Sequence, residues 1–138
     1  MIFRYVRIKV PGGELVRVPA IPISLTCNKR YQDIYALIDS GAEVSVFNAA
    51  IARTLNIDIE RGKYLSLKGF IGADVDSYLH QINVSIQGLG SADFLFAVTN
   101  TKEPQMPILG QRGFFDRFQI RFERYKDLME LYPRSTTF

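Results

Sequence analysis

The sequence has few of the side chains on which many hydrolytic sites depend. Its 138 residues contain one histidine, one cysteine and no tryptophan. A zinc site needs several His or Cys ligands at short spacing, and this inventory does not supply them. A Ser/His/Asp or Cys/His site would have to use His80. This residue shares the apolar face of a predicted strand with Tyr78 and Ile82. We therefore interpret His80 as a structural residue and expect no metal and no other cofactor.

Long apolar runs are also missing. Runs such as Phe94 to Val98 are far shorter than the roughly 20 residues that a membrane-spanning helix needs. The first ten residues alternate charged and apolar side chains and lack the apolar stretch and cleavage site of a secretory signal. The lone Cys27 cannot form an intrachain disulfide, which is typical of a reducing compartment. We therefore expect a cytoplasmic protein without a membrane partner.

The overall charge is weak. The formal net charge is +3, and basic residues are interspersed with acidic ones along the chain. Charge alone therefore does not indicate nucleic-acid binding. A composition of 47% hydrophobic and 22% charged residues, without a linker or repeat, is typical of one globular domain, which we expect to span residues 1–138.

Alternating apolar residues and turn signals predict a mostly β fold. Residues 2–10 and 14–26 are rich in β-branched and aliphatic side chains and are separated by Pro11-Gly12-Gly13, so they predict an opening pair of strands. Residues 63–87 predict a hairpin whose tip contains glycine. The only clear helix of the first half is expected at residues 49–55, with Asn48 as its N-cap.

The C-terminal half continues with short strands. One is expected at Phe94 to Val98, and another at residues 118–123, where Phe118, Ile120 and Phe122 fall on one face. A turn and a last strand at residues 128–132 would close the chain. The whole pattern predicts many short strands with one or two short helices.

The candidate catalytic residue is Asp39, which ends an apolar strand and is followed at once by Ser40 and Gly41. Glycine permits a tight turn that brings backbone N–H groups close to the carboxylate. One carboxylate cannot both activate a water and polarise a carbonyl in the same step. No second apolar-apolar-Asp-Ser/Thr-Gly sequence exists in the chain, because Asp76-Ser77 and Asp116 are followed by other residues. The second carboxylate must therefore come from a second copy, in a twofold dimer whose two acids share one proton.

These residues carry a family resemblance. Ile38-Asp39-Ser40-Gly41-Ala42 resembles the active-site signature of retropepsin-like aspartic proteases, and Ile108-Leu109-Gly110 resembles their second hydrophobic-glycine element. The hairpin at residues 63–80 is similar to their flap. The resemblance covers about residues 20–133. The C-terminal tail of the chain is similar to that of compact bacterial and archaeal members. Residues 1–19 form an extension without a clear counterpart in the minimal retroviral enzyme.

The resemblance implies a closed β-barrel that is active as a twofold homodimer. It implies that Asp39 is catalytic, that Ser40 bonds across the dimer axis, and that Gly41 helps to position the substrate in the active-site loop that ends at Ala42. It also implies that the flap tip closes over an extended peptide; the tip residues are Gly69, Phe70, Ile71 and Gly72.

Two positions depart from the family pattern. In retroviral members an arginine directly follows the second-element glycine, whereas here Gln111 stands before Arg112. Glu43 replaces the aspartate that is common after the alanine. The structural role of that arginine and the substrate contact of that aspartate are therefore not transferred to this chain.

The sequence thus predicts an aspartic endopeptidase that acts through a water between the two Asp39 side chains and binds peptide or protein substrates. An alternative is a non-catalytic dimeric peptide-binding or assembly module of the same fold, with Asp39 as a structural loop acid. A more distant alternative is a β-barrel adaptor that binds nucleic acid through a mildly basic surface. Oligonucleotide binding that depends on salt would support this last class, which we do not favour.

Overall fold

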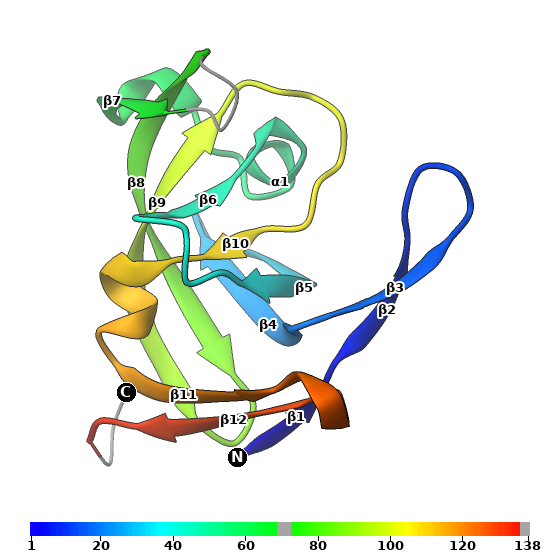
Figure 1. Ribbon diagram of the computed structural model, residues 1–138. Coiled ribbons are helices and arrows are strands. Elements are labelled where there is room, and N and C mark those ends of the chain that lie inside the picture. Colours follow the sequence, from blue (N-terminus) through cyan, green and yellow to red (C-terminus); the bar gives the residue numbers. More distant parts are fainter. Residues whose placement is uncertain (69–72, 136–138) are drawn as a thin grey trace.

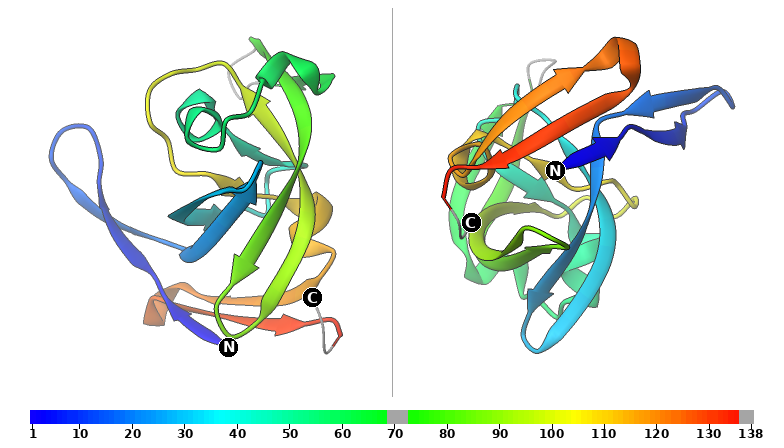
Figure 2. Two further views of the ribbon diagram at one scale, coloured as in Figure 1. Left: turned by 180° about the vertical axis from the view of Figure 1, so that it is seen from behind. Right: turned by 90° about the horizontal axis from the view of Figure 1, so that it is seen from below.

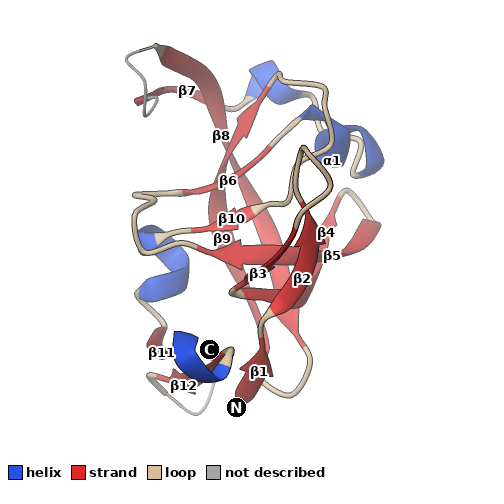
Figure 3. Cartoon of the chain, turned by 45° about the vertical axis from the view of Figure 1, so that its right-hand side comes forward, coloured by secondary structure: helices blue, strands red, loops and turns tan. Residues whose placement is uncertain are grey.

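The computed structural model describes residues 1–68 and 73–135, and more than half of these residues belong to strands (Figures 1 and 3). In chain order the strands are β1 (Ile2–Arg4), β2 (Val6–Lys9), β3 (Leu15–Val18), β4 (Ala20–Cys27), β5 (Arg30–Ile38), β6 (Ser45–Phe47), β7 (Lys63–Lys68), β8 (Asp74–Ile86), β9 (Gly90–Thr99), β10 (Ile108–Leu109), β11 (Phe118–Glu123) and β12 (Leu128–Pro133). The helical segments are α1 (Ala49–Thr54), η1 (Ile59–Arg61), η2 (Gln111–Phe115) and η3 (Arg124–Lys126).

A closed barrel forms the centre of the molecule. Its strands follow the order β4-β5-β10-β6-β9-β8, and β8 pairs back onto β4 through the register Ser24↔Ser85 to Thr26↔Asn83. The pairs β5–β10 and β6–β9 are parallel, whereas the other barrel pairs are antiparallel. Closure leaves these strands without long free edges. The predicted mostly β, closed-barrel fold is confirmed.

The core fills the interior of this barrel. On β8 the apolar side chains of Ile82, Val84 and Ile86 are fully buried, which confirms the period-two pattern. On the neighbouring strand β9, the buried Phe96 packs against Phe47 of β6 with ring centroids 5.0 Å apart. Aromatic and β-branched side chains suit such a pleated, buried surface. The barrel is therefore held mainly by apolar packing.

Helix α1 closes one end of the barrel. Asn48 is its N-cap, and its side-chain oxygen accepts a hydrogen bond from the backbone N–H of Ala50 at 3.1 Å. Ile51 of the helix and its C-cap residue Leu55 are buried in the core. The prediction of a helix at residues 49–55 with this cap is confirmed to within one residue.

The opening segments differ from the expected single pair of strands. Each divides: the first at Tyr5 and the second at Pro19. Proline cannot donate to a strand ladder, and the N–H of Tyr5 donates to the carbonyl of Asp127 at 2.8 Å. As a result β2 pairs only with β3, while β1 joins β12 and β4 joins β5.

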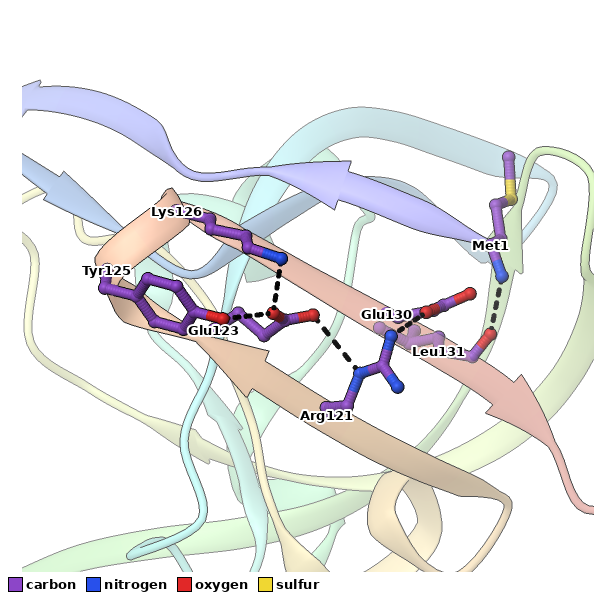
Figure 4. Close-up of polar contacts among 7 residues, drawn as sticks. All are labelled: Met1, Arg121, Glu123, Tyr125, Lys126, Glu130 and Leu131. Atoms are coloured by element: carbon purple, nitrogen blue, oxygen red, sulfur yellow. Dashed lines mark hydrogen bonds and ion pairs between the residues drawn. The ribbon is translucent and has the colours of Figure 1, made fainter.

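The ends of the chain form a three-stranded sheet in the order β1-β12-β11, drawn in part in Figure 4. The terminal ammonium of Met1 donates to the carbonyl of Leu131 at 2.8 Å. Phe118, Ile120 and Phe122 alternate along β11 as predicted for a half-buried edge strand, with Phe118 buried and Phe122 39% exposed at the end of the strand. There β11, an edge strand, runs into the η3 turn.

Across residues 1–68 and 73–135, no helix combines the length and apolarity that crossing a bilayer requires.

Candidate active site

Asp39 lies directly beyond the last residue of β5, at the start of the loop that leads to β6 (Figure 1). Ala36 and Ile38 anchor the end of this strand in the core. The Asp39 side chain is half-buried, and its Oδ1 accepts a hydrogen bond from the N–H of Gly41 at 2.9 Å. The N–H of Ala42 donates to the Asp39 carbonyl at 3.2 Å, which closes a tight turn. The loop thus holds one carboxylate oxygen and leaves the other without a hydrogen bond from the described residues.

The second predicted element lies beside this loop. Strand β10 lies between β5 and β6, with Leu109 opposite Ile38 in parallel register and Ile108 opposite Val46 in antiparallel register. The N–H of Asp39 donates to the carbonyl of Leu109 at 3.0 Å. The two motifs, far apart in the sequence, are therefore joined directly through the backbone.

Gly110 packs against the loop without room for a side chain. A Cβ atom at this position would lie 2.6 Å from the Val44 carbonyl oxygen and 2.7 Å from that of Ala42. Its N–H donates to the buried hydroxyl of Ser45 at 3.0 Å. The glycine of the second element is thus required by close backbone contact.

The two residues after Gly110 form hydrogen bonds with the loop that follows Asp39. The backbone N–H groups of Gln111 and Arg112 donate to the carbonyls of Ala42 at 2.8 Å and Glu43 at 2.9 Å. The Gln111 side-chain Nε2 donates to the carbonyl of Ser40 at 2.6 Å. Arg112 also lies 3.5 Å from the Glu43 carboxylate, but both side chains are exposed, so this ion pair contributes at most about 1 kcal/mol.

The loop residues differ in exposure. Ser40 and Gly41 are exposed, whereas Ala42 is half-buried. In the described parts of the chain, no group of three or more His, Cys, Asp or Glu side chains is placed to hold a metal ion. The arrangement therefore presents one oriented carboxylate, with a hydroxyl and a glycine beside it, on an exposed turn.

The hairpin that resembles the family's flap is present as β7–β8, paired from Lys63↔Leu79 to Lys68↔Asp74; its role as a flap stays a prediction. The Tyr64 hydroxyl donates to the Asp76 carboxylate at 2.7 Å, and this hydrogen bond raises the pKa of Tyr64. The tip residues Gly69, Phe70, Ile71 and Gly72 lie outside the described residues. Their contact with substrate stays a prediction.

His80 has a structural environment. Its Nε2 lies 2.7 Å from the carbonyl oxygen of Ile59 in η1. A Cβ atom on Gly62 would lie 2.6 Å from the same nitrogen, so η1 packs tightly onto this ring. These contacts account for His80 without a catalytic role.

Sequence reasoning missed two residues of the site, Ser45 and Gln111. Ser45 lies in an apolar strand and resembles any strand serine, although its hydroxyl accepts from Gly110. In the sequence, Gln111 stands out only as a departure from the family pattern, although its side chain reaches the Asp39 loop. An amide directly after the second-element glycine was the one available signal.

Comparisons with known proteins support the fold. No protein-family model and no curated protein sequence matches the chain. Among solved structures, a retropepsin-like aspartic protease from Rickettsia conorii has a TM-score of 0.59 and 18% identity, covering 95% of this chain and 91% of that one. EIAV protease in complex with an inhibitor has a TM-score of 0.51 and 20% identity, covering 68% of this chain and 82% of that one. The chain therefore has a retropepsin-like fold.

Proposed function

We propose that this chain is an aspartic endopeptidase that acts as a twofold homodimer, with Asp39 of each copy in the catalytic pair. The observation that carries the proposal is the Asp39 turn: a half-buried carboxylate, oriented by the Gly41 N–H and braced from β10. The likeness of the fold to two aspartic proteases supports the same chemistry.

Two copies are required by the chemistry. Peptide hydrolysis by carboxylates needs one ionised group as base and one protonated group as acid. Each chain supplies one acid in this sequence context. A twofold axis beside the Asp39 turn places the same residue of both copies together, where they share one proton because two adjacent carboxylates cannot both ionise.

The reaction needs only a water molecule as nucleophile and proton transfers between the two carboxyl groups and the substrate. The ionised Asp39 takes a proton from a water molecule as the water oxygen attacks the peptide carbonyl carbon, and the protonated Asp39 of the other copy gives its proton to the carbonyl oxygen. The resulting tetrahedral intermediate collapses when the C–N bond breaks. The first carboxyl returns its proton to the leaving nitrogen, and the second regains one from the intermediate, so no covalent enzyme adduct forms.

Substrate is proposed to bind as an extended strand between the Asp39 loops and the β7–β8 hairpins, by β-augmentation. Side chains of such a strand point alternately to opposite sides. Ser40 is proposed to bond across the dimer axis, and Gly41 to leave room for the peptide backbone.

The test is cleavage of a diverse peptide library from mildly acidic to neutral pH, with purified protein of known oligomeric state. We expect Asp39→Asn to lower kcat by roughly a thousandfold or more, because it removes the acid–base group. A pepstatin-type transition-state mimic should block the same cleavage. Asp58→Asn is the matched control, because it makes the same change at an exposed carboxylate outside the loop.

Cleavage that survives in Asp39→Asn would refute the shared-carboxylate mechanism. A stable dimer that binds peptides with and without Asp39 but cleaves none would identify the non-catalytic peptide-binding module.

A further inference from the structure

The arm, which we define as residues 6–18, stands apart from the barrel. It consists of β2, β3 and the turn between them, and it forms a separate two-stranded sheet. In Figures 1 and 2 it projects away from the barrel as a long hairpin. The valine and isoleucine side chains of its two strands pair across one face, as Val6↔Val18 and Ile8↔Val16. None of them belongs to the core of the barrel or to the residues packed against it.

The net charge of the chain is concentrated at this end. Residues 1–19 contain four basic side chains and one acidic side chain, whereas the remaining 119 residues contain 13 basic and 13 acidic ones. The basic residues are Arg4, Arg7, Lys9 and Arg17. The arm and its root therefore carry the whole formal charge of +3, and the rest of the molecule is neutral.

Two of these charges are directly opposed across the hairpin. Arg7 lies opposite Arg17, and like charges in this position destabilise a strand pair. Arg17 forms an ion pair with the half-buried carboxylate of Asp127, which also pairs with Arg124. Arg7 and its neighbour on the same face, Lys9, make no ion pair with any described residue. The arm thus presents two uncompensated cations, two residues apart, on one strand.

The backbone of β2 is open at the same place. The N–H of Val10 donates to the carbonyl of Glu14 at 2.9 Å, which fixes the hydrogen-bonded pairs of the hairpin. Because such pairs alternate in an antiparallel ladder, the N–H and C=O groups of Arg7 and Lys9 point outward. No described strand pairs with this edge of β2. It is free to accept a further strand.

The root of the arm is firmly held. The N–H of Tyr5 donates to the Asp127 carbonyl at 2.8 Å, and Arg17 reaches the Asp127 side chain. On the other side of the root, the N–H of Ile38, next to Asp39, donates to the Pro19 carbonyl at 2.9 Å. The root of the arm is therefore tied both to the terminal sheet and to the barrel strand that leads into Asp39.

We infer that the arm is a docking site for an extended acidic segment, which adds a third strand to the free edge of β2 with its carboxylates opposite Arg7 and Lys9. Side chains alternate along a strand, so the segment carries two acidic residues separated by one other residue. The inference rests on the proposed function in one respect: the acidic segment is taken to be part of the protein substrate. It lies outside the stretch of substrate that is bound at Asp39. Residues 6–18 contain no aromatic side chain on which bases stack or which anchors in a membrane interface, so peptide is favoured over nucleic acid and lipid.

The experiment measures binding without cleavage. Full-length Asp39→Asn protein is titrated against a fluorescently labelled peptide of alternating Glu and Val, and binding is followed by anisotropy. A peptide of the same composition with its glutamates grouped together, and one with Lys in place of Glu, serve as ligand controls. We expect the alternating peptide to bind tightest. These peptide comparisons all use the same Asp39→Asn protein with an intact arm, so they do not depend on how arm variants fold.

Variants of the arm locate the site. Arg7→Glu/Lys9→Glu is expected to weaken binding about tenfold or more, because two attractive cross-strand pairs become repulsive. The matched control is Arg30→Glu/Lys102→Glu, which makes the same charge change at two exposed positions outside the arm and should bind as before. Arg7→Pro should weaken binding more than Arg7→Ala, because both lose the charge but only proline loses the outward N–H.

Three results would overturn the inference. One is equal binding of the alternating and grouped peptides, and another is binding that does not change in the folded double variant of the arm. The third is tighter arm-dependent binding of an oligonucleotide or an anionic vesicle than of the peptide. None of these outcomes depends on catalysis, so the inference and the proposed function fail separately.

Discussion

Two glycines of the candidate site differ in what a side chain would meet. At Gly110 a Cβ atom would lie within 2.7 Å of backbone oxygens on two sides, whereas at Gly41 the nearest atom is the Asp39 Oδ1, at 3.2 Å. A side-chain oxygen can turn away, but a carbonyl in the braced loop cannot move without breaking the hydrogen bonds around it.

We therefore expect Gly110→Ala to lower the free energy of unfolding by about 1–3 kcal/mol or more, because it overpacks a rigid contact. Gly41→Ala should cost less than about 1 kcal/mol while displacing the Asp39 carboxylate and lowering kcat. Urea titrations of both variants give the comparison. If Gly110→Ala were as stable as the unchanged protein, the loop would have shifted to make room for the Cβ atom. The expectation of a rigid contact would then be wrong.

Gln111 offers a second test at the residue scale. Its side chain holds the Ser40 carbonyl at 2.6 Å from an exposed position. If the proposed function holds, we expect Gln111→Glu, which removes the donor at constant size, to lower kcat roughly three- to tenfold with little change in KM, since one hydrogen bond that orients the Asp39 turn is lost. Steady-state kinetics separates the two constants.

Gln119→Glu is the control for this change, because it adds the same charge at an exposed residue of β11. A rise in KM at constant kcat would assign Gln111 to substrate binding instead of loop positioning. A fall in both variants would point to net charge as the cause.

At the scale of the elements, the terminal sheet is tied by charged groups around Glu123 (Figure 4). Its carboxylate lies 3.2 Å from the Lys126 ammonium, accepts from the Tyr125 hydroxyl at 3.1 Å and lies 3.3 Å from Arg121. The hydrogen bond from Lys126, followed by that from Tyr125, lowers the pKa of Glu123 below its ordinary value of 4.5.

A lowered carboxyl pKa stabilises the fold above the unfolded value, near 4.5, and this contribution disappears as the pH falls through the lower folded value. We expect the unchanged protein to exceed Glu123→Gln in Tm at neutral pH, and the difference to shrink below about pH 4.5. Thermal melts across this range give the measurement. Glu60→Gln, at an exposed carboxylate without an ion pair among the described residues, is the control. A difference that grows on acidification would contradict the sign.

The elements differ in whether they can be predicted from the sequence. Local signals are strong for the β7–β8 hairpin, for the period-two face of β8, and for α1 with its Asn48 cap. The pairing of β1 with β12 has no local signal, because it joins residues about 130 positions apart. The division of the first two runs at Tyr5 and Pro19 follows from such distant partners.

The same reason separates the parts of the candidate site. Asp39 and Ile108-Leu109-Gly110 are visible because an apolar strand or pair leads into an acid or a glycine. The contacts of Ser45 and Gln111 are not visible, because each side chain meets a residue 65 or 71 positions away. Sequence patterns identify groups that can react, whereas the groups that hold them are fixed by the barrel.

At the scale of the whole molecule, the decisive property is that each chain brings a single Asp39. If both copies are needed for one reaction, activity depends on pairs and not on single chains. Mixing subunits tests this directly, because unchanged and Asp39→Asn chains have the same dimer surface apart from one amide.

Equal amounts of the two chains are unfolded together, refolded, and assayed at the same total concentration as the unchanged protein. Random pairing makes about a quarter of the dimers fully wild type, so we expect about a quarter of the activity, because a dimer with one Asp39 lacks either the acid or the base. Mixing with Asp58→Asn, treated in the same way, should retain full activity. About half of the activity would mean that each Asp39 works alone, and the shared-proton mechanism would then be wrong.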